Sequence, residues 1–384
     1  MAGTGRGRRG FLVRRAALCL TIGTALAAAA AACGTAAQPG QAGGAVAAQA
    51  AAQAETINEA GSSLLYPLMR SWAVAYQRQA PGVTVKTAST SSGKGIAAAS
   101  AGTVDIGASD AYLSSGDLVK TPTLVNIPLV IAAQTVIYNL PDVSSSQHVK
   151  LDGALLAGIY QGTITMWDDP RIAAINPHVT LPAIKIVPVY RSDSSGDTFL
   201  FTSYLSTGSQ SAPDSQWNAA IGYGTTVAWP NVPGEVPEAG SVNVLHACES
   251  TPGCLAYNGI SYLSQALAAN LGEAELANYA GDFTLPTAQA IQDSVASFVS
   301  LTPPNETISL IDGPSPTGYP IVNYEYAVVS TRQLTAGRAS ALRAFLKWLI
   351  TTGNQPSYLG TYGLQPLPGA LVTLGEQQIA EIGS

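Results

Sequence analysis

Charged residues are scarce in this chain of 384 amino acids, and their scarcity excludes several kinds of protein. Only 11% of the residues are Asp, Glu, Lys or Arg, where about a quarter is usual for a globular chain. With a pI of about 5.1, the chain lacks the basic surface that a nucleic-acid-binding protein needs. Hydrophobic residues make up 47%, which excludes a wholly disordered chain. The length predicts two domains of ~100–200 residues, each able to bury a core.

Histidine is also scarce, and the motifs of common hydrolases are missing. The chain has three His and four Cys, whereas a structural zinc site needs four such ligands close together. It contains neither a Gly-x-Ser-x-Gly turn nor a His-Glu-x-x-His helix, the motifs of serine hydrolases and zinc peptidases. The sequence therefore gives little support to an enzyme or a metalloprotein.

The first 33 residues have the pattern of a bacterial secretory signal. Five Arg between positions 6 and 15 precede an Ala-rich apolar stretch, which ends at Ala30-Ala31-Ala32-Cys33. This end resembles a lipobox, in which Cys33 is lipidated and becomes the mature N-terminus. Cleavage at a nearby small residue, giving a soluble secreted protein, is the alternative. Arg8-Arg9 fits a twin-arginine export signal, and an ordinary Sec signal fits equally well.

Removal of this signal makes the protein more acidic and simplifies its cysteines. Thirteen basic and 24 acidic residues remain, a net charge of −11. Residues 34–55, rich in Ala, Gly and Gln, predict a flexible tether. Cys248 and Cys254 then remain, six residues apart around Pro252 and Gly253. In an exported chain we expect them to form a disulfide bond.

Strand-like and helical patterns alternate from about Thr56 onward. The predicted elements are strands at 83–85 and 104–106, a helix with apolar positions Leu65, Met69, Trp72, Val74 and Tyr76, a helix capped by Asp152, and a C-terminal helix over 342–350. The apolar stretch 124–140 is broken by Pro128, Gln134 and Asn139, which favours buried strands over a membrane span. Such alternation predicts α/β layers.

Three segments share one arrangement, in which a strand-like run leads through a Ser/Gly-rich turn into a helix. They are Gly61-Ser62-Ser63 before Leu64, Ser91-Ser92-Gly93-Lys94-Gly95 before Ile96, and residues 191–198 before Phe199. Each helix start presents unpaired backbone N–H groups and the positive end of a helix dipole, which bind anions. Ordinary helix caps are the alternative for any single segment, and Ser194-x-x-Asp197 fits a capping box. Together, and with an arginine in the third, they indicate an oxyanion site.

Longer strings connect these turns to a known family. In order they are Ala60-Gly61-Ser62-Ser63, Ser91-Ser92-Gly93, Val104-Asp105-Ile106-Gly107-Ala108-Ser109-Asp110, Trp167-Asp168-Asp169-Pro170 and Arg191-x-Asp193-x-Ser195-Gly196. From about residue 56 to the C-terminus the chain resembles the phosphate-binding subunit of the phosphate-specific ABC importer, most closely the actinobacterial and mycobacterial lipoproteins. The resemblance implies an α/β, two-lobed periplasmic-binding-protein (type II) fold. Lobe I would comprise 56–132 and 321–384, lobe II would comprise 133–320, and two hinge strands would join them.

The resemblance also implies the residues that hold phosphate between the lobes. They are Ser63, Leu64, Ser91, Asp110, Arg191, Ser195, Gly196 and Asp197, with Asp193 holding Arg191 in place. Asp110 would accept a hydrogen bond from the ligand's proton. Phosphate near neutral pH retains an O–H and sulfate has none, so a buried carboxylate discriminates by ~10⁴ or more.

One position departs from the pattern of many relatives. Position 197 is Asp where many family members have Thr, although the actinobacterial members also carry Asp. A second carboxylate would accept a second ligand hydroxyl and so accommodate monobasic phosphate; a capping-box side chain that points away from the ligand is the alternative. Lys94 stands where Gly is common, and we expect its side chain to be solvated.

The function that the resemblance implies is a transport receptor and not an enzyme. It would bind inorganic phosphate, close its lobes, dock on the permease subunits and release the ion, without a cofactor or metal. The protein would be a monomer, exported and lipid-anchored to the outer face of the cell membrane. The alternatives are a receptor for another oxyanion, such as sulfate or molybdate, and a secreted phosphatase or hydrolase.

Overall fold

The computed structural model describes residues 54–144, 146–208 and 217–384. The predicted signal, the lipidation site Cys33 and nearly all of the predicted tether lie outside these ranges. The first strand, β1, begins at Glu55, which is the last residue assigned to the tether.

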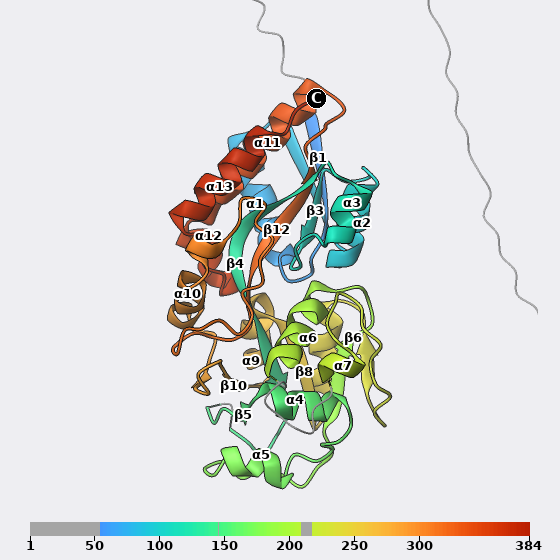
Figure 1. Cartoon of the computed structure of the whole chain (residues 1–384), viewed down its shortest axis with the longest axis vertical. Helices are drawn as coiled ribbons and strands as arrows, with labels where there is room; N and C mark the ends of the chain where they lie inside the picture. Colours follow the sequence, from blue (N-terminus) through green and yellow to red (C-terminus); the bar gives the residue numbers. More distant parts are fainter. Residues whose placement is uncertain (1–53, 145, 209–216) are drawn as a thin grey trace, which may run out of the picture. The chain divides into compact units, whose positions relative to one another are not determined.

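A mixed sheet of nine strands runs through the described residues (Figure 1), in the order β2-β1-β3-β12-β4-β8-β6-β7 with β9 beside β4. Its strands are β1 (Glu55–Gly61), β2 (Val83–Ser89), β3 (Ile106–Ser109), β4 (Leu124–Tyr138), β6 (Val187–Arg191), β7 (Val236–Glu238), β8 (Cys254–Gly259), β9 (Gly272–Glu273) and β12 (Val322–Ser330). A second sheet contains β5 (Lys150–Leu151), β10 (Glu275–Ala277) and β11 (Phe283–Thr284). The α/β prediction is confirmed.

Strand β4 joins two halves of the large sheet. From Leu124 to Ala133 it pairs with β12, and from Gln134 to Tyr138 it pairs with β8. All but one of its residues are buried, as expected for a strand covered on both faces. The predicted two-lobed fold is confirmed. The lobe boundaries at 132 and 321 stay predictions.

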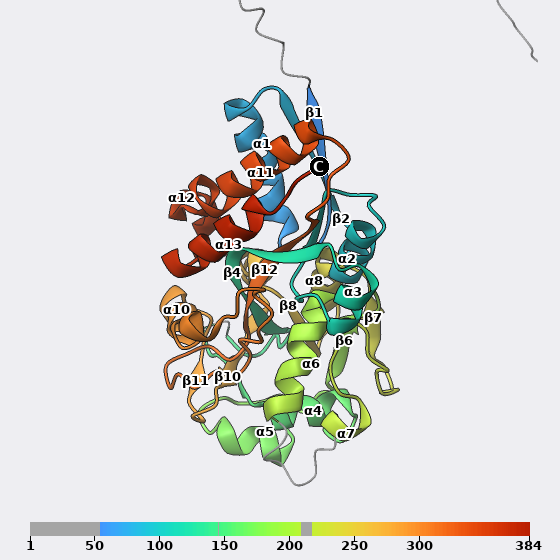
Figure 2. The same ribbon diagram turned by 45° about the horizontal axis from the view of Figure 1, so that its top comes forward.

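Thirteen α-helices and four short 3-10 helices surround these strands in the described residues. The α-helices are α1 (Tyr66–Gln79), α2 (Ser92–Ser100), α3 (Ser115–Lys120), α4 (Gly153–Tyr160), α5 (Pro170–Ile175), α6 (Gly196–Gly208), α7 (Trp217–Ala220), α8 (Ser241–Ser250), α9 (Leu263–Ala268), α10 (Ala288–Ala296), α11 (Ala336–Ile350), α12 (Pro356–Leu359) and α13 (Gly369–Ala380). The 3-10 helices are η1 (Ile260–Tyr262), η2 (Val299–Leu301), η3 (Thr352–Asn354) and η4 (Gly360–Tyr362). Helices α11 and α13 lie side by side in both views (Figure 2), and α2 lies across the sheet from them.

Two helices test the predictions made from local sequence. The Asp152 carboxylate accepts from the backbone N–H of Leu155 at 2.7 Å and caps α4 as predicted. Helix α1 buries Met69, Trp72 and Tyr76, but Val74 is 55% exposed. The inclusion of Val74 in the apolar face was therefore wrong, because it lies two positions from Trp72 and so projects from another side of the helix.

The hydrophobic core is continuous between the two halves of the sheet. One cluster of buried side chains includes Trp72 on α1, Ile131 on β4 and Tyr257 on β8. The predicted Cys248–Cys254 disulfide is present and joins the end of α8 to β8. In the described part of the chain no helix is long and apolar enough to span a membrane. Within the same ranges, no group of three or more His, Cys, Asp or Glu is placed to hold a metal ion.

Candidate functional site

The three Ser/Gly-rich turns follow the carboxyl ends of β1, β2 and β6. Because β1 is parallel to β2 and to β3, the carboxyl ends of β1, β2 and β3 meet at one edge of the sheet. The backbone N–H of Ser91 donates to the Gly61 carbonyl at 2.8 Å, which joins the first two turns. The N–H of Gly93, at the start of α2, donates to the Ser194 carbonyl at 2.9 Å. The turns therefore come from both halves of the sheet and lie together.

Two of the helices begin earlier than the sequence predicts. Helix α2 starts at Ser92 and α6 at Gly196, not at Ile96 and Phe199. A side chain on Gly95 would place its Cβ 2.7 Å from the Ala108 carbonyl oxygen. Close packing of α2 on the sheet thus requires glycine there and outweighs its low helix propensity.

Ser63 and Leu64 connect the first turn to the other half of the molecule. The Ser63 hydroxyl lies 3.0 Å from Nη1 of Arg191 and 2.7 Å from the hydroxyl of Ser241. Leu64 is fully buried, and a Cβ on Gly259 would lie 2.3 Å from its Cγ. Side chains from β1–α1, β6 and α8 thus surround the same point.

Two predicted ligand residues carry buried hydroxyl groups without a protein partner. The side-chain oxygens of Ser91 and Ser195 make no hydrogen bond, and both residues are about 1% exposed. Ser91 has a φ of 132°. Residues other than glycine rarely adopt this backbone conformation, and those that do cluster at functional sites. The N–H of Ser195 donates to the Thr225 carbonyl at 2.7 Å, so its hydroxyl is the group left for a ligand. A buried, unpaired hydroxyl costs about 1–3 kcal/mol, which points to a ligand at this position.

Arg191 is a buried cation fixed in one orientation. Nε and Nη2 each donate to an oxygen of Asp193 at 2.7 Å, and Nη1 donates to Asp197 at 2.5 Å. The phenol of Tyr257 accepts from the Arg191 backbone N–H at 2.9 Å. Although burial alone would lower the pKa of Arg191, the hydrogen bond to Asp193 and the charge of Asp197 raise it above its ordinary value. The guanidinium stays charged at every relevant pH.

The Asp197 side chain points toward Arg191 and Ser241. It accepts from Arg191, from the Ser241 hydroxyl at 3.1 Å and from Nε2 of Gln134 at 3.2 Å. The capping-box alternative is therefore wrong, and the Ser194 hydroxyl bonds to Thr225 instead. Burial, with the charge of Asp110, raises the pKa of Asp197 to about 7.

Asp110 directly follows β3 and is also buried. Its Oδ1 accepts from the Ser62 hydroxyl, while a Cβ on Gly196 would lie 2.4 Å from its Oδ2. Oδ2 therefore faces the N-terminus of α6. Burial raises the pKa of Asp110, and hydrogen bonds from Glu325 and Ser62 oppose this shift.

Sequence reasoning missed three residues of this cluster. They are Gln134 on β4, Ser241 at the start of α8 and Glu325 on β12. The signal for Ser241 was the turn Ala239-Gly240-Ser241 between β7 and α8, which repeats the arrangement of the other three turns. Gln134 and Glu325 lie inside apolar strands. A polar residue in such a strand was the only sequence signal that either belongs to the site. Lys94 is exposed, as expected.

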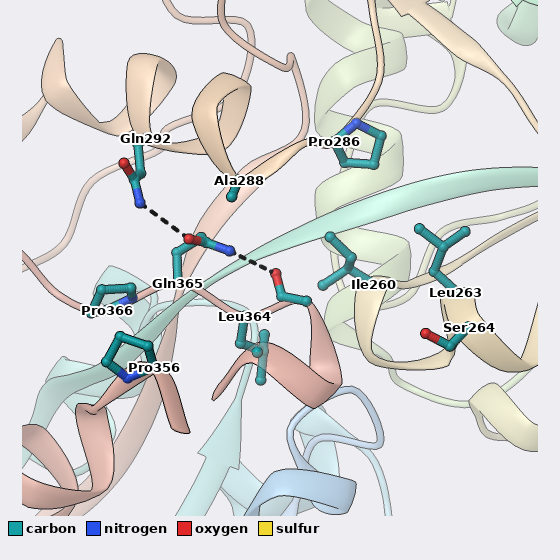
Figure 3. A pocket seen from close by; sticks show the side chains of 12 residues that line it. Ile260, Leu263, Ser264, Pro286, Ala288, Gln292, Pro356, Leu364, Gln365 and Pro366 are labelled. Carbon is teal, nitrogen blue, oxygen red and sulfur yellow. Dashed lines mark hydrogen bonds between the residues drawn. The ribbon is translucent and has the colours of Figure 1, made fainter. Parts of the chain in front are cut away.

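A separate cavity of about 460 Å³ lies outside this cluster (Figure 3). Gln292 and Gln365 point toward each other there, and Nε2 of Gln292 donates to Oε1 of Gln365 at 3.1 Å. None of the eight predicted phosphate-binding residues lines it.

Comparison with known proteins adds a family. Residues 46–352 match the family model described as a PBP superfamily domain. A "Phosphate-binding protein PstS" of Methanocaldococcus jannaschii is 33% identical over 331 residues, which cover 80% of this chain and 81% of the relative. The "Phosphate-binding protein PstS 3" of Mycobacterium tuberculosis is 31% identical, over 85% of this chain and 88% of its own.

Solved structures agree on the fold. A phosphate-binding protein from Stenotrophomonas maltophilia aligns with a TM-score of 0.63 at 21% identity, covering 84% of this chain and 93% of its own. A high-affinity periplasmic phosphate-binding protein bound with phosphate aligns with a TM-score of 0.65 at 22% identity, covering 86% and 99%.

Proposed function

The chain belongs to the PBP superfamily and, within it, to the PstS family of phosphate-binding proteins, and on this premise we propose that it binds inorganic phosphate for delivery to an ABC importer. The observation that carries the proposal is the pair of buried, partnerless hydroxyls of Ser91 and Ser195, on turns that meet near the buried cation Arg191 through the Gly93–Ser194 and Ser63–Arg191 hydrogen bonds. Two donors and a fixed cation between two sheet halves suit a small tetrahedral anion. The net charge is −6 for the whole chain and −11 if the predicted signal is removed, so local attraction is necessary, because the molecule as a whole repels anions.

Eight residues are proposed to contact the ion: Ser63, Leu64, Ser91, Asp110, Arg191, Ser195, Gly196 and Asp197. The hydroxyls, the backbone N–H groups at the helix starts and the guanidinium would donate to phosphate oxygens. Asp193 would keep Arg191 in place through its two hydrogen bonds. The two carboxylates would act in the opposite sense and accept hydrogen bonds from protonated oxygens of the ligand.

Asp110 is proposed to give the selectivity. Its Oδ1 already accepts from Ser62, and its Oδ2 faces the start of α6, where the other donors gather. An ion without a proton would bring an unprotonated oxygen against this carboxylate, which is a repulsive contact in a buried place. Phosphate satisfies the carboxylate, whereas sulfate does not.

Titration calorimetry of the mature protein with phosphate and with sulfate tests the proposal. We expect saturable binding of phosphate and none of sulfate, and Ser91→Ala and Ser195→Ala should each weaken phosphate binding about tenfold or more. Ser300→Ala, at an exposed position of η2, is the matched control and should bind as the parent. Equal responses to both anions would favour another oxyanion receptor. Phosphoester turnover that Ser195→Ala abolishes would favour an enzyme.

Transport also needs a place and a partner. We propose that the protein is exported, is anchored at Cys33 to the outer face of the cell membrane, and releases phosphate to the permease subunits as a monomer. Mass spectrometry of the mature N-terminus tests the lipid directly. A Cys33→Ser variant should leave the membrane fraction and should still bind phosphate.

A further inference from the structure

A second buried carboxyl group, that of Glu325 on β12, lies beside Asp110. Glu325 is fully buried. Its Oε1 accepts from Nδ2 of Asn323 at 2.7 Å, and its Oε2 lies 3.3 Å from the hydroxyl oxygen of Ser62. The same Ser62 hydroxyl bonds to Asp110 Oδ1. Two buried carboxyl groups therefore share one hydroxyl.

The number of available protons decides how this contact can exist. A serine hydroxyl has one proton to donate and two lone pairs that accept. The backbone N–H of Leu65 donates to Ser62 Oγ at 3.0 Å and uses one lone pair. If Ser62 donates to Asp110, only the second lone pair remains toward Glu325. That contact is a hydrogen bond only when Glu325 carries a proton on Oε2.

The surroundings favour a proton on Glu325 and a charge on Asp110. Burial, followed by the negative charge of Asp110, raises the pKa of Glu325 well above its ordinary value, and Asp197 on α6 acts in the same direction. Burial also raises the pKa of Asp110, but hydrogen bonding that involves Glu325 and Ser62, together with the charge of Arg191, opposes that shift. Arg191 thus stabilises a charge on Asp110, whereas the neighbouring carboxylates disfavour one on Glu325.

We propose that Glu325 is a positioning residue for phosphate recognition, which stays protonated and donates through Ser62 so that Asp110 presents an ionised Oδ2 to the ligand. The inference rests on the proposed function, because Asp110 is taken as the acceptor of the phosphate proton. The arrangement holds Oδ1 in place from one side. Oδ2 faces the start of α6 and is the oxygen of Asp110 placed to accept from the ion, which sets the direction of that hydrogen bond.

Glu325→Gln is the decisive variant, because an amide N–H can replace the carboxylic proton. We expect its phosphate affinity and its preference over sulfate to stay within about threefold of the parent. Glu325→Leu fills a similar volume without a donor and should weaken phosphate binding about tenfold or more. Ser62→Ala removes the bridging hydroxyl and should have a similar effect, so the test survives if the Leu variant does not fold. Glu306→Gln, at a buried acid whose Oε2 accepts from Gln378 on α13, is the matched control and should bind as the parent.

Infrared spectroscopy supplies a readout that does not depend on binding. The difference spectrum between the parent and Glu325→Gln at pH 8 should contain the carbonyl band of a protonated carboxylic acid. If that band is missing, or if Glu325→Gln binds both anions tenfold more tightly, Glu325 is charged in the parent and the inference is wrong. Parent-like binding by both Glu325→Leu and Ser62→Ala would also overturn it. If the parent binds no phosphate, both the proposed function and the positioning role of Glu325 are wrong. If the parent binds phosphate but one of the contrary results above is found, only the positioning role is wrong.

Discussion

Gly196→Ala tests how closely the two halves of the site must approach. Gly196 is the first residue of α6, and Asp110 lies against it from the other half of the sheet. An added Cβ would lie 2.4 Å from Asp110 Oδ2 and 2.6 Å from Asp110 Cγ. Ordinary contacts of a Cβ begin at 3.4 Å, so the carboxylate would have to retreat by about 1 Å.

The expected loss follows from the cost of this contact. Inserting a methyl group into a packed site costs about 1–3 kcal/mol. Because the contact joins the two halves, we assign this cost to the ligand-bound arrangement, which weakens phosphate binding about 5- to 150-fold. The isolated helix start should not suffer, since alanine is the better residue in a helix by roughly 0.5–1 kcal/mol.

Calorimetric titration together with urea unfolding separates these effects. Gly369→Ala is the matched control, because Gly369 is also the first residue of a helix and an added Cβ there meets nothing within 4 Å. The control should bind phosphate as the parent does. Parent-like affinity in Gly196→Ala would show that Asp110 and α6 do not meet in the bound form, and the geometric argument would then be wrong.

Three further predictions concern protons and the disulfide. Phosphate affinity should change by less than about threefold between pH 8 and 5.5. As the pH falls, Asp197, with its pKa of about 7, is protonated in the same range as the ligand, so both lose negative charge together. A fall in affinity that follows the fraction of dianionic phosphate in calorimetric titrations would contradict this. Burial raises the pKa of Glu306 to about 9, so its contribution to stability is present at low pH and is lost as pH rises from about 4.5 toward 9, at up to ~1.4 kcal/mol per pH unit. Glu306→Gln should therefore flatten the rise of urea-unfolding free energy toward low pH, and an unchanged slope would refute that assignment. Replacing Cys248 and Cys254 by serine should lower the free energy of unfolding by about 2 kcal/mol while phosphate binding persists, and an unchanged midpoint of thermal unfolding would show that the bond adds no stability.

Local sequence predicted the parts of the site that depend on the end of a strand. The turns after β1, β2 and β6 each contain small residues before a helix, and parallel strands bring such turns to one edge of a sheet. The shared turn pattern, together with the family resemblance, allowed Ser63, Ser91 and Ser195 to be grouped before their contacts were known. The Asp152 cap of α4 followed from similarly local chemistry.

The remaining features depend on contacts between distant segments. No local pattern distinguishes Gln134 or Glu325 from an interruption in an apolar strand, and their partners lie 63 residues away for Gln134 and 263 for Glu325. The early start of α2 depends on the missing side chain of Gly95, which matters only once the helix packs on the sheet. The direction of the Asp197 side chain depends on Arg191 and Ser241, and the capping motif alone favoured the wrong direction.

The long strand β4 has a consequence for how the protein unfolds. One continuous backbone contributes hydrogen bonds to both halves of the sheet, and one apolar cluster extends through both. Unfolding of either half would remove the hydrogen-bond partners of part of β4, which the other half still requires as a paired strand. The two halves are therefore expected to denature together, in a single calorimetric transition.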